Sequence, residues 1–262
     1  MATAAPAPRV GPLIRDWRHR RRLSQLDLAL RAGVSARHLS FVETGRSRPS
    51  AEMVLTLSRW LEVPLRERNR LLLAAGHAPA FEQQDLDDDA MAPVRDALRL
   101  VLDAHRPSPA AVVDGAWELV AANDGLALLT EGVAGHLLAP PVNVLRVSLH
   151  PEGMAPRILN LGEWRAHLLE RLGRQVALTG DPALAALLDE LAGYPGPEAD
   201  PAGRPAAGEI AVPLRLRTGR GDLAFISTVA TFGTAVEVTA SELSIESFFP
   251  ADAATAAAVA PR

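Results

Sequence analysis

The sequence contains neither cysteine nor lysine, and each absence excludes a class of chemistry. Without cysteine the chain can form no disulfide, thiolate nucleophile, iron–sulfur cluster or thiolate zinc site. All 27 basic residues are arginine, so a P-loop lysine and a lysine Schiff base are excluded as well. Whatever this chain does, it does with other side chains.

Histidine is present, but not in the spacings of common metal sites. None of the seven histidines falls into HxH or HExxH, the spacings that put two ligands on one face of a strand or helix. The GxSxG motif of a nucleophilic serine does not occur either. We therefore expect no catalytic residue, no metal and no cofactor, and an enzyme is the least favoured function.

Long apolar runs are also missing. No stretch approaches the roughly 18 consecutive apolar residues of a membrane-spanning helix. The first eight residues are small and proline-rich, which does not fit an export signal. We expect a cytoplasmic protein without a membrane partner.

The charges that are present divide unevenly along the chain. Residues 1–76 contain 14 arginines and 6 acidic residues, a balance of +8, whereas residues 77–262 contain 13 arginines and 25 acidic residues, a balance of −12. The overall net charge of −4 therefore hides a basic N-terminal module, and only that module suits a polyanion.

The most informative stretch is residues 23–50, which have the pattern of two short helices joined by a turn. Ser24 and Ser35 can cap the two helices, and Gly33 suits the left-handed turn between them. We expect the first helix to bury Leu26, Ala29 and Leu30 and the second to bury Leu39 and Val42. An ordinary helical hairpin with a basic rim would have the same pattern.

A resemblance favours one of these readings. Leu23-Ser24-Gln25, Ala29, the run 32–35, Leu39 and Glu43-x-Gly45 match the motif of the XRE helix-turn-helix family, the repressor and Cro type. Arg18 matches the first-helix arginine that pairs with the glutamate of that motif. The resemblance implies a five-helix, lambda-repressor-like domain that binds double-stranded DNA in the nucleoid.

The resemblance also implies a role for individual residues. The helix that starts at Ser35 would enter the major groove, where Arg37 could bind guanine. The residues expected to read bases are Ala36, Arg37, Ser40 and Phe41. The residues expected to bind the DNA backbone are Gln25, Ser35, Thr44, Arg46, Ser47 and Arg48. Arg18 and Glu43 are expected to form a structural ion pair.

Composition predicts five segments. We expect a disordered tail over residues 1–10, the DNA-binding domain over 11–76 and an acidic linker over 77–91. A second domain should cover 92–250, and a C-terminal tail should cover 251–262.

The second domain reads as a mixture of helices and strands. A helix over 93–105 precedes a hairpin around Asp114-Gly115, and further helices fill the middle of the chain. Alternation predicts strands over 209–217, 223–232 and 236–249, with Pro213 at a sheet edge. Together these give an antiparallel sheet of about five strands, with helices packed on one face.

A second resemblance covers nearly the whole chain, from about Pro12 to Thr255. The runs RHLSFVETGRSRPS, PAAVVDGAWELVAAN, SLHPEGMAPRILNLGEWRAHLLERL and FISTVATFGTAVEVTASELSIESFFPAD resemble the MmyB-like transcriptional regulators. The resemblance implies that an XRE domain is followed by a PAS-like, ligand-binding domain with flanking helices. It implies a small-molecule effector but does not identify it.

Candidate pocket residues follow from the expected fold. The large side chains that could line a pocket, or could be ordinary core, are Trp117, Trp164, Phe225 and Phe232. The cations that could hold the polar head of an apolar ligand are Arg146, His150 and Arg157.

The sequence therefore predicts a DNA-binding transcription regulator, acting as a homodimer. Its second domain would sense a small, apolar, fatty-acid-like molecule. In the alternative, that domain only dimerises or binds a protein partner and has no effector.

Overall fold

The computed structural model describes residues 9–197, 211–233, 235 and 237–260. The chain divides into two compact units, and the division falls between Gln83 and Gln84. The residues expected to form an N-terminal tail lie largely outside the described part, which begins at Arg9 and enters a helix at Val10.

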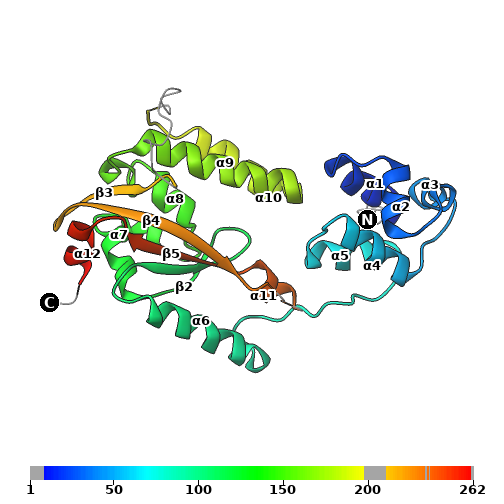
Figure 1. Ribbon diagram of the computed structural model, residues 1–262, viewed down its shortest axis with the longest axis horizontal. Helices are drawn as coiled ribbons and strands as arrows, with labels where there is room; N and C mark the ends of the chain where they lie inside the picture. The colour runs from blue at the N-terminus through cyan, green and yellow to red at the C-terminus, as the bar shows by residue number, and fades with distance from the viewer. Residues whose placement is uncertain (1–8, 198–210, 234, 236, 261–262) are drawn as a thin grey trace, which may run out of the picture. The chain divides into compact units, whose positions relative to one another are not determined.

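The first unit is a bundle of helices (Figure 1). Its elements are α1 (Val10–Arg20), α2 (Gln25–Ala32), α3 (Ala36–Glu43), α4 (Ala51–Trp60) and α5 (Leu65–Ala74). The five helices confirm the fold expected for this part. Their core is built from fully buried aliphatic side chains that include Ile14, Leu28, Leu39, Val42 and Leu57.

Local sequence sets the ends of α2 and α3. The Ser24 hydroxyl accepts a hydrogen bond from the Asp27 backbone N–H, and the Ser35 hydroxyl accepts one from His38. These caps satisfy N–H groups that have no partner within the helix. Gly33 ends α2 at a φ of 67°, a left-handed conformation that glycine adopts without strain.

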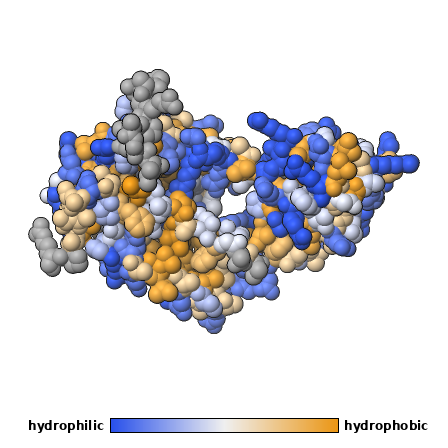
Figure 2. All heavy atoms as spheres, in the orientation of Figure 1, coloured by the Kyte–Doolittle hydropathy of each residue, from blue (hydrophilic) through white to orange (hydrophobic). Residues whose placement is uncertain are grey.

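The buried face of α2 differs from the expected one. Leu28 and Ala29 are buried, whereas Leu26 is 58% exposed and Leu30 is 71% exposed. On a helix of eight residues with five apolar side chains, more than one stripe fits the helical period. Leu28 faces inward because α2 packs against α3 and α4. On the surface of this unit, Figure 2 shows hydrophobic patches among hydrophilic residues.

The second unit contains an antiparallel sheet in the order β2-β1-β5-β4-β3. Its strands are β1 (Ala110–Val113), β2 (Leu119–Ala122), β3 (Leu214–Thr218), β4 (Gly221–Thr231) and β5 (Ser244–Pro250). Its helices are α6 (Ala92–Ala104), α7 (Ala127–Thr130), α8 (Val144–Leu149), α9 (Leu161–Thr179), α10 (Pro182–Ala192), α11 (Val238–Glu242) and α12 (Ala253–Val259). The expected five-stranded sheet with flanking helices is confirmed.

Helices lie on both faces of this sheet, not on one (Figure 1). Leu98 and Leu102 of α6 pack with Val112 and Ile245 on one face. The main core, which includes Trp164 and Leu168 of α9, lies on the other face. Successive residues of a strand point to opposite faces of the sheet. Because both faces are apolar, helices must shield each of them from solvent.

Two expected strands are shorter than predicted. β3 begins at Leu214, directly after Pro213, which has no N–H for pairing and whose carbonyl accepts a bond from Asn160. The rest of that expected strand includes Ile210, which lies outside the described residues. The expected strand 236–249 instead contains α11, and β5 follows it.

The expected C-terminal tail is also corrected, because residues 253–259 form α12. Asp252 caps this helix through the Thr255 N–H. The Thr255 side chain is fully buried, and its hydroxyl accepts a hydrogen bond from the Ala224 N–H of β4 at 3.0 Å. α12 is therefore part of the second unit.

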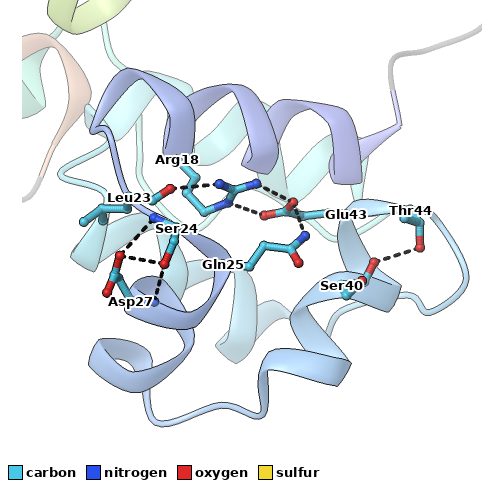
Figure 3. Close-up of polar contacts among 8 residues, drawn as sticks. All are labelled: Arg18, Leu23, Ser24, Gln25, Asp27, Ser40, Glu43 and Thr44. Carbon is cyan, nitrogen blue, oxygen red and sulfur yellow. Dashed lines mark hydrogen bonds and ion pairs between the residues drawn. The ribbon is translucent and has the colours of Figure 1, made fainter.

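A buried ion pair joins α1 to the end of α3 (Figure 3). Arg18 Nε and Nη2 donate to the two carboxylate oxygens of Glu43 at 2.8 and 2.9 Å. Arg18 Nη1 donates to the Leu23 carbonyl, and Gln25 Nε2 donates to Glu43 at 2.7 Å. Gly11 permits the close approach, because a Cβ there would overlap the Val42 carbonyl oxygen.

The environment of Glu43 favours its charged form. Burial alone would raise the pKa of the Glu43 carboxyl. The hydrogen bonds from Arg18 and Gln25, with the positive charge of Arg18, outweigh burial and hold that pKa below its usual value. The same hydrogen bond to Glu43 raises the pKa of Arg18.

We predict that Glu43→Gln destabilises the first unit by about 3 kcal/mol, because it leaves Arg18 buried without a counter-charge. Hydrogen exchange of the amides in α1 and α3, followed by mass spectrometry of the full chain, measures this loss. The matched control is Glu67→Gln, which breaks the more exposed pair with Arg70 and should cost less than about 1 kcal/mol.

Acid should act in the same direction as the substitution. Because the pKa of Glu43 is depressed in the folded state, the pair contributes its stability above the unfolded pKa and loses it as the pH falls through the folded one. Unchanged protection of α1 and α3 in Glu43→Gln would contradict the structural role given to this pair.

Candidate functional site

The solvent face of α3 carries two exposed residues in its first turn, Arg37 and His38. Leu39 and Val42 point into the core, so the helix presents its opposite side to solvent. The N-terminus of a helix is a favourable position for contact with phosphate, because its backbone N–H groups carry partial positive charge.

Two arginine side chains lie close to the ring of Phe41 on this surface. The guanidinium carbon of Arg37 lies 5.4 Å from the centroid of the Phe41 ring, and that of Arg46 lies 6.0 Å from it. Cations at this distance are attracted by the face of an aromatic ring. The half-buried ring therefore holds a guanidinium from the helix and one from the following turn on one surface.

Other residues expected at the DNA interface already have partners within the chain. The Gln25 amide donates to Glu43, as described above. Arg48 Nε donates to the Ala75 carbonyl at 2.7 Å, and its Nη2 donates to the Gly76 carbonyl. The Thr44 hydroxyl donates to the Ser40 carbonyl at 2.7 Å. These side chains would have to exchange or share these bonds to contact DNA.

The remaining expected contacts differ in exposure. Ala36 is half-buried and packs against the core, which reduces the surface it can offer to a base. Ser40 and Ser47 are half-buried, whereas Arg46 is exposed. His38 was not among the expected base readers, although its position three residues before Phe41 puts both on one helical face.

The second unit contains a cavity of about 70 Å³ between the sheet and the helices α7, α8 and α9. Its wall is mainly aliphatic and aromatic. The lining residues are Ala111, Val113, Leu126, Leu129, Thr130, Val144, Leu145, Val147, Ser148, Met154, Trp164, Leu168, Leu214, Glu246 and Phe248. Such a wall suits an apolar occupant.

Few polar side chains line this cavity. The Ser148 hydroxyl accepts a hydrogen bond from Trp164 Nε1 at 3.0 Å. Glu246 is paired with Arg171 of α9, and both side chains are largely buried. The Arg171 guanidinium also lies 4.4 Å from the Trp117 ring. The cavity therefore has a paired charge at one place on an otherwise apolar wall.

Of the four large side chains predicted to line a pocket, Trp164 lines this cavity and the others do not. Trp117 is buried and donates to Gln175 at 2.7 Å. Phe225 is fully buried in the main core. Phe232 packs with the α6 cluster on the opposite face of the sheet.

The three predicted cationic anchors also lie outside the cavity lining. Arg146 forms a bidentate pair with Glu190 at 2.8 and 2.7 Å, which holds the pKa of Glu190 at about 2. His150 packs edge-on against the Tyr194 ring. Arg157 donates to the Leu129 carbonyl, and burial lowers its pKa.

The polar pair at the cavity was missed in the sequence, although a signal exists. Glu246 lies two residues before Phe248 in β5, so strand alternation puts both on one face. A carboxylate on a buried strand face requires a partner, but Arg171 lies on a distant helix and no local pattern identifies it.

One group of side chains could hold a metal ion, and the sequence did not predict it. His136, His150 and Glu152 each offer a ligand atom, and these atoms lie within 4.8 Å of one another. His136 comes from the segment 135–138 and the other two from the turn after α8. The spacing of 14 residues between the histidines explains why no sequence motif reveals the group.

None of the helices in the described ranges is long and apolar enough to cross a membrane.

Comparison with protein families identifies both units. Residues 14–68 match the helix-turn-helix family model. Residues 94–260, more than half of the chain, match the model of the MmyB-like transcription regulator ligand binding domain. No curated protein matches the chain.

These matches agree with the geometry of each unit. A helix-turn-helix contacts DNA with the second of its two helices. The second helix here is α3, whose first turn exposes Arg37 and His38, and the second unit contains an apolar cavity. The two resemblances found in the sequence are confirmed. The chain belongs to the family defined by the MmyB-like transcription regulator ligand binding domain and is a DNA-binding transcription regulator with that domain at its C-terminal end.

Proposed function

We propose that α3 binds in the major groove of an operator, with Arg37 reading a base and Arg46 binding the backbone. The observation that carries this proposal is the arrangement of both guanidiniums around Phe41. Arg37 lies in the first turn of α3, the part of a recognition helix that contacts base edges. Arg46 lies in the turn after the helix, where it can approach phosphates.

We also propose that the cavity of the second unit binds a small apolar molecule, and fatty acids are the class to test first. Support comes from its mainly apolar wall and from a charged residue in its lining, Glu246, which is paired with Arg171. The cavity is smaller than the roughly 300 Å³ of a drug-sized pocket, so a slim chain suits it better than a ring system. Arg171 and Glu246 would face the polar end of the ligand.

The regulator would act as a homodimer on a palindromic or repeated site in the cytoplasm. One helix-turn-helix module buries only about 600 to 1,000 Å² on DNA, which supports pairing of two modules for specificity. The second unit would bind its effector without chemical turnover.

We predict that Arg37→Ala and Arg46→Ala have different effects on DNA binding. Arg37→Ala should cost about 1 to 3 kcal/mol and relax the preference at one base position. Arg46→Ala should weaken binding to all sequences alike. It should also reduce the slope of the logarithm of the binding constant against the logarithm of the salt concentration by about one unit. Fluorescence anisotropy with a selected operator and its single-base variants, over a range of salt, measures both.

Arg70→Ala is the matched control, because Arg70 is exposed on α5 and has no part in the proposed interface. Its binding should equal that of the unmodified protein. If Arg37→Ala keeps the full base preference, the proposed orientation of α3 on DNA is wrong.

A second prediction concerns the cavity. A fatty acid that fits the cavity, added at about 100 times its dissociation constant, should raise the melting temperature of the second unit by about 5 to 10 °C. Ala111→Leu should remove most of this shift, because Ala111 lines the cavity and is buried on β1. A thermal-shift series of saturated fatty acids and fatty alcohols of increasing length measures it.

Ala230→Leu makes the same change at an exposed position of β4 and should leave the shift intact. If no member of the series shifts the unmodified protein, the alternative gains support, in which this unit only dimerises or binds a protein partner.

A further inference from the structure

We propose that His136, His150 and Glu152 form a binding site for a divalent transition metal ion, with Zn²⁺ the best fit. The ligand atoms of the three side chains lie within 4.8 Å of one another. His136 Nε2 is 3.9 Å from Glu152 Oε2, and the two imidazole rings meet edge to face with centroids 5.8 Å apart. No other group of this kind occurs in the part of the chain that the structure describes.

The donor set is one of those that bind Zn²⁺ in proteins without thiolate ligands. Two imidazole nitrogens and one carboxylate oxygen bind Zn²⁺ at about 2.0 to 2.2 Å and leave a fourth position for water or another ligand. Imidazole nitrogens favour zinc, nickel and copper over magnesium and calcium, which prefer oxygen. The site is therefore expected to reject Mg²⁺.

The side chains can close around an ion without disturbing the core. The side chains of His136 and Glu152 are 58% and 66% exposed, so changes of rotamer meet little resistance. Closure brings ligand atoms that are up to 4.8 Å apart to the roughly 3.5 Å spacing that bonds of about 2.1 Å around one tetrahedral ion impose.

The backbone below the three side chains is well fixed. The Ala134 N–H donates to the Glu152 carbonyl at 2.9 Å, which joins the two segments that supply the ligands. The Gly153 N–H donates to the His150 carbonyl at 2.8 Å. A Cβ at Gly153 would overlap the Val147 carbonyl oxygen, so this turn packs tightly against α8.

His150 must exchange one partner on binding. Its Nδ1 accepts a hydrogen bond from the Glu152 backbone N–H at 3.0 Å, which places the proton of the neutral ring on Nε2. A metal ion bound at Nδ1 takes the place of the Glu152 N–H as the partner of that nitrogen. A metal ion bound at Nε2 requires the ring proton to be on Nδ1, which can then no longer accept the hydrogen bond from Glu152. The Tyr194 ring, 5.1 Å away, restricts the imidazole to a narrow range of orientations.

The site lies beside the wall of the cavity. Val147 and Met154, which line the cavity, flank the turn that carries His150 and Glu152. A bound ion would join this turn to residues 135–138 and stiffen that part of the wall. Metal binding itself does not depend on the proposed ligand, so the failure of either proposal leaves the other intact.

Isothermal titration of the full-length, untagged chain with Zn²⁺ tests the site. We expect one Zn²⁺ per chain, no competition by Mg²⁺, and a loss of affinity of at least tenfold in His136→Ala and in Glu152→Gln. His19→Ala and Glu52→Gln are the matched controls, because both residues are exposed in the first unit, and their affinity should not change.

Titration with Co²⁺ gives a readout that needs no variant. A tetrahedral site with imidazole ligands should give visible absorption bands that saturate at one Co²⁺ per chain and disappear when Zn²⁺ is added. Absence of these bands would overturn the proposal, as would equal Zn²⁺ affinity in His136→Ala, Glu152→Gln and the two controls. Circular dichroism confirms that each variant is folded, which the exposure of His136 and Glu152 leads us to expect.

Discussion

The first unit depends on the buried pair of Arg18 and Glu43. Two charges removed from water are tolerated only when their geometry is good and their remaining hydrogen-bonding groups are satisfied. Here the guanidinium is bidentate to the carboxylate, and Leu23 and Gln25 complete the network. Hydrophobic packing alone would tolerate small rotations of α3, whereas this network fixes the helix that carries Arg37 and Phe41 relative to α1.

In the second unit, the alternation of side chains along the strands determines which residues face each side of the sheet. Ala110 and Val112 of β1 and Ile245 of β5 belong to the α6 cluster, whereas their neighbours Ala111, Val113 and Glu246 line the cavity. Ala111 and Glu246 are cross-strand partners and both line the cavity. A methyl group and a carboxylate fill less space on an apolar face than two large aliphatic side chains would. The cavity thus arises where the sheet presents a methyl group and a carboxylate side by side.

Charge separates the two units as clearly as the fold does. The first 76 residues have a balance of +8 and the remainder a balance of −12, so the polyanion DNA is attracted to one unit and repelled by the other. Arginine is the basic residue throughout, and its planar guanidinium serves three different contacts here. The guanidinium of Arg18 binds the Glu43 carboxylate, that of Arg37 lies over the Phe41 ring, and that of Arg48 donates to a backbone carbonyl.

The sequence by itself determined the features whose causes lie within a few residues: the serine caps at Ser24 and Ser35, the turn at Gly33, the hairpin at Asp114-Gly115, and the division into a basic and an acidic part. Family motifs added the two domains and the partnership of Arg18 with Glu43. Tertiary structure alone decided which face of α2 is buried, that Trp164 and not Trp117 lines the cavity, and that Arg146 pairs with Glu190. It also brought His136 next to His150. Capping and periodicity act over one or two turns of chain, whereas the partner of a long side chain depends on which distant segments pack together.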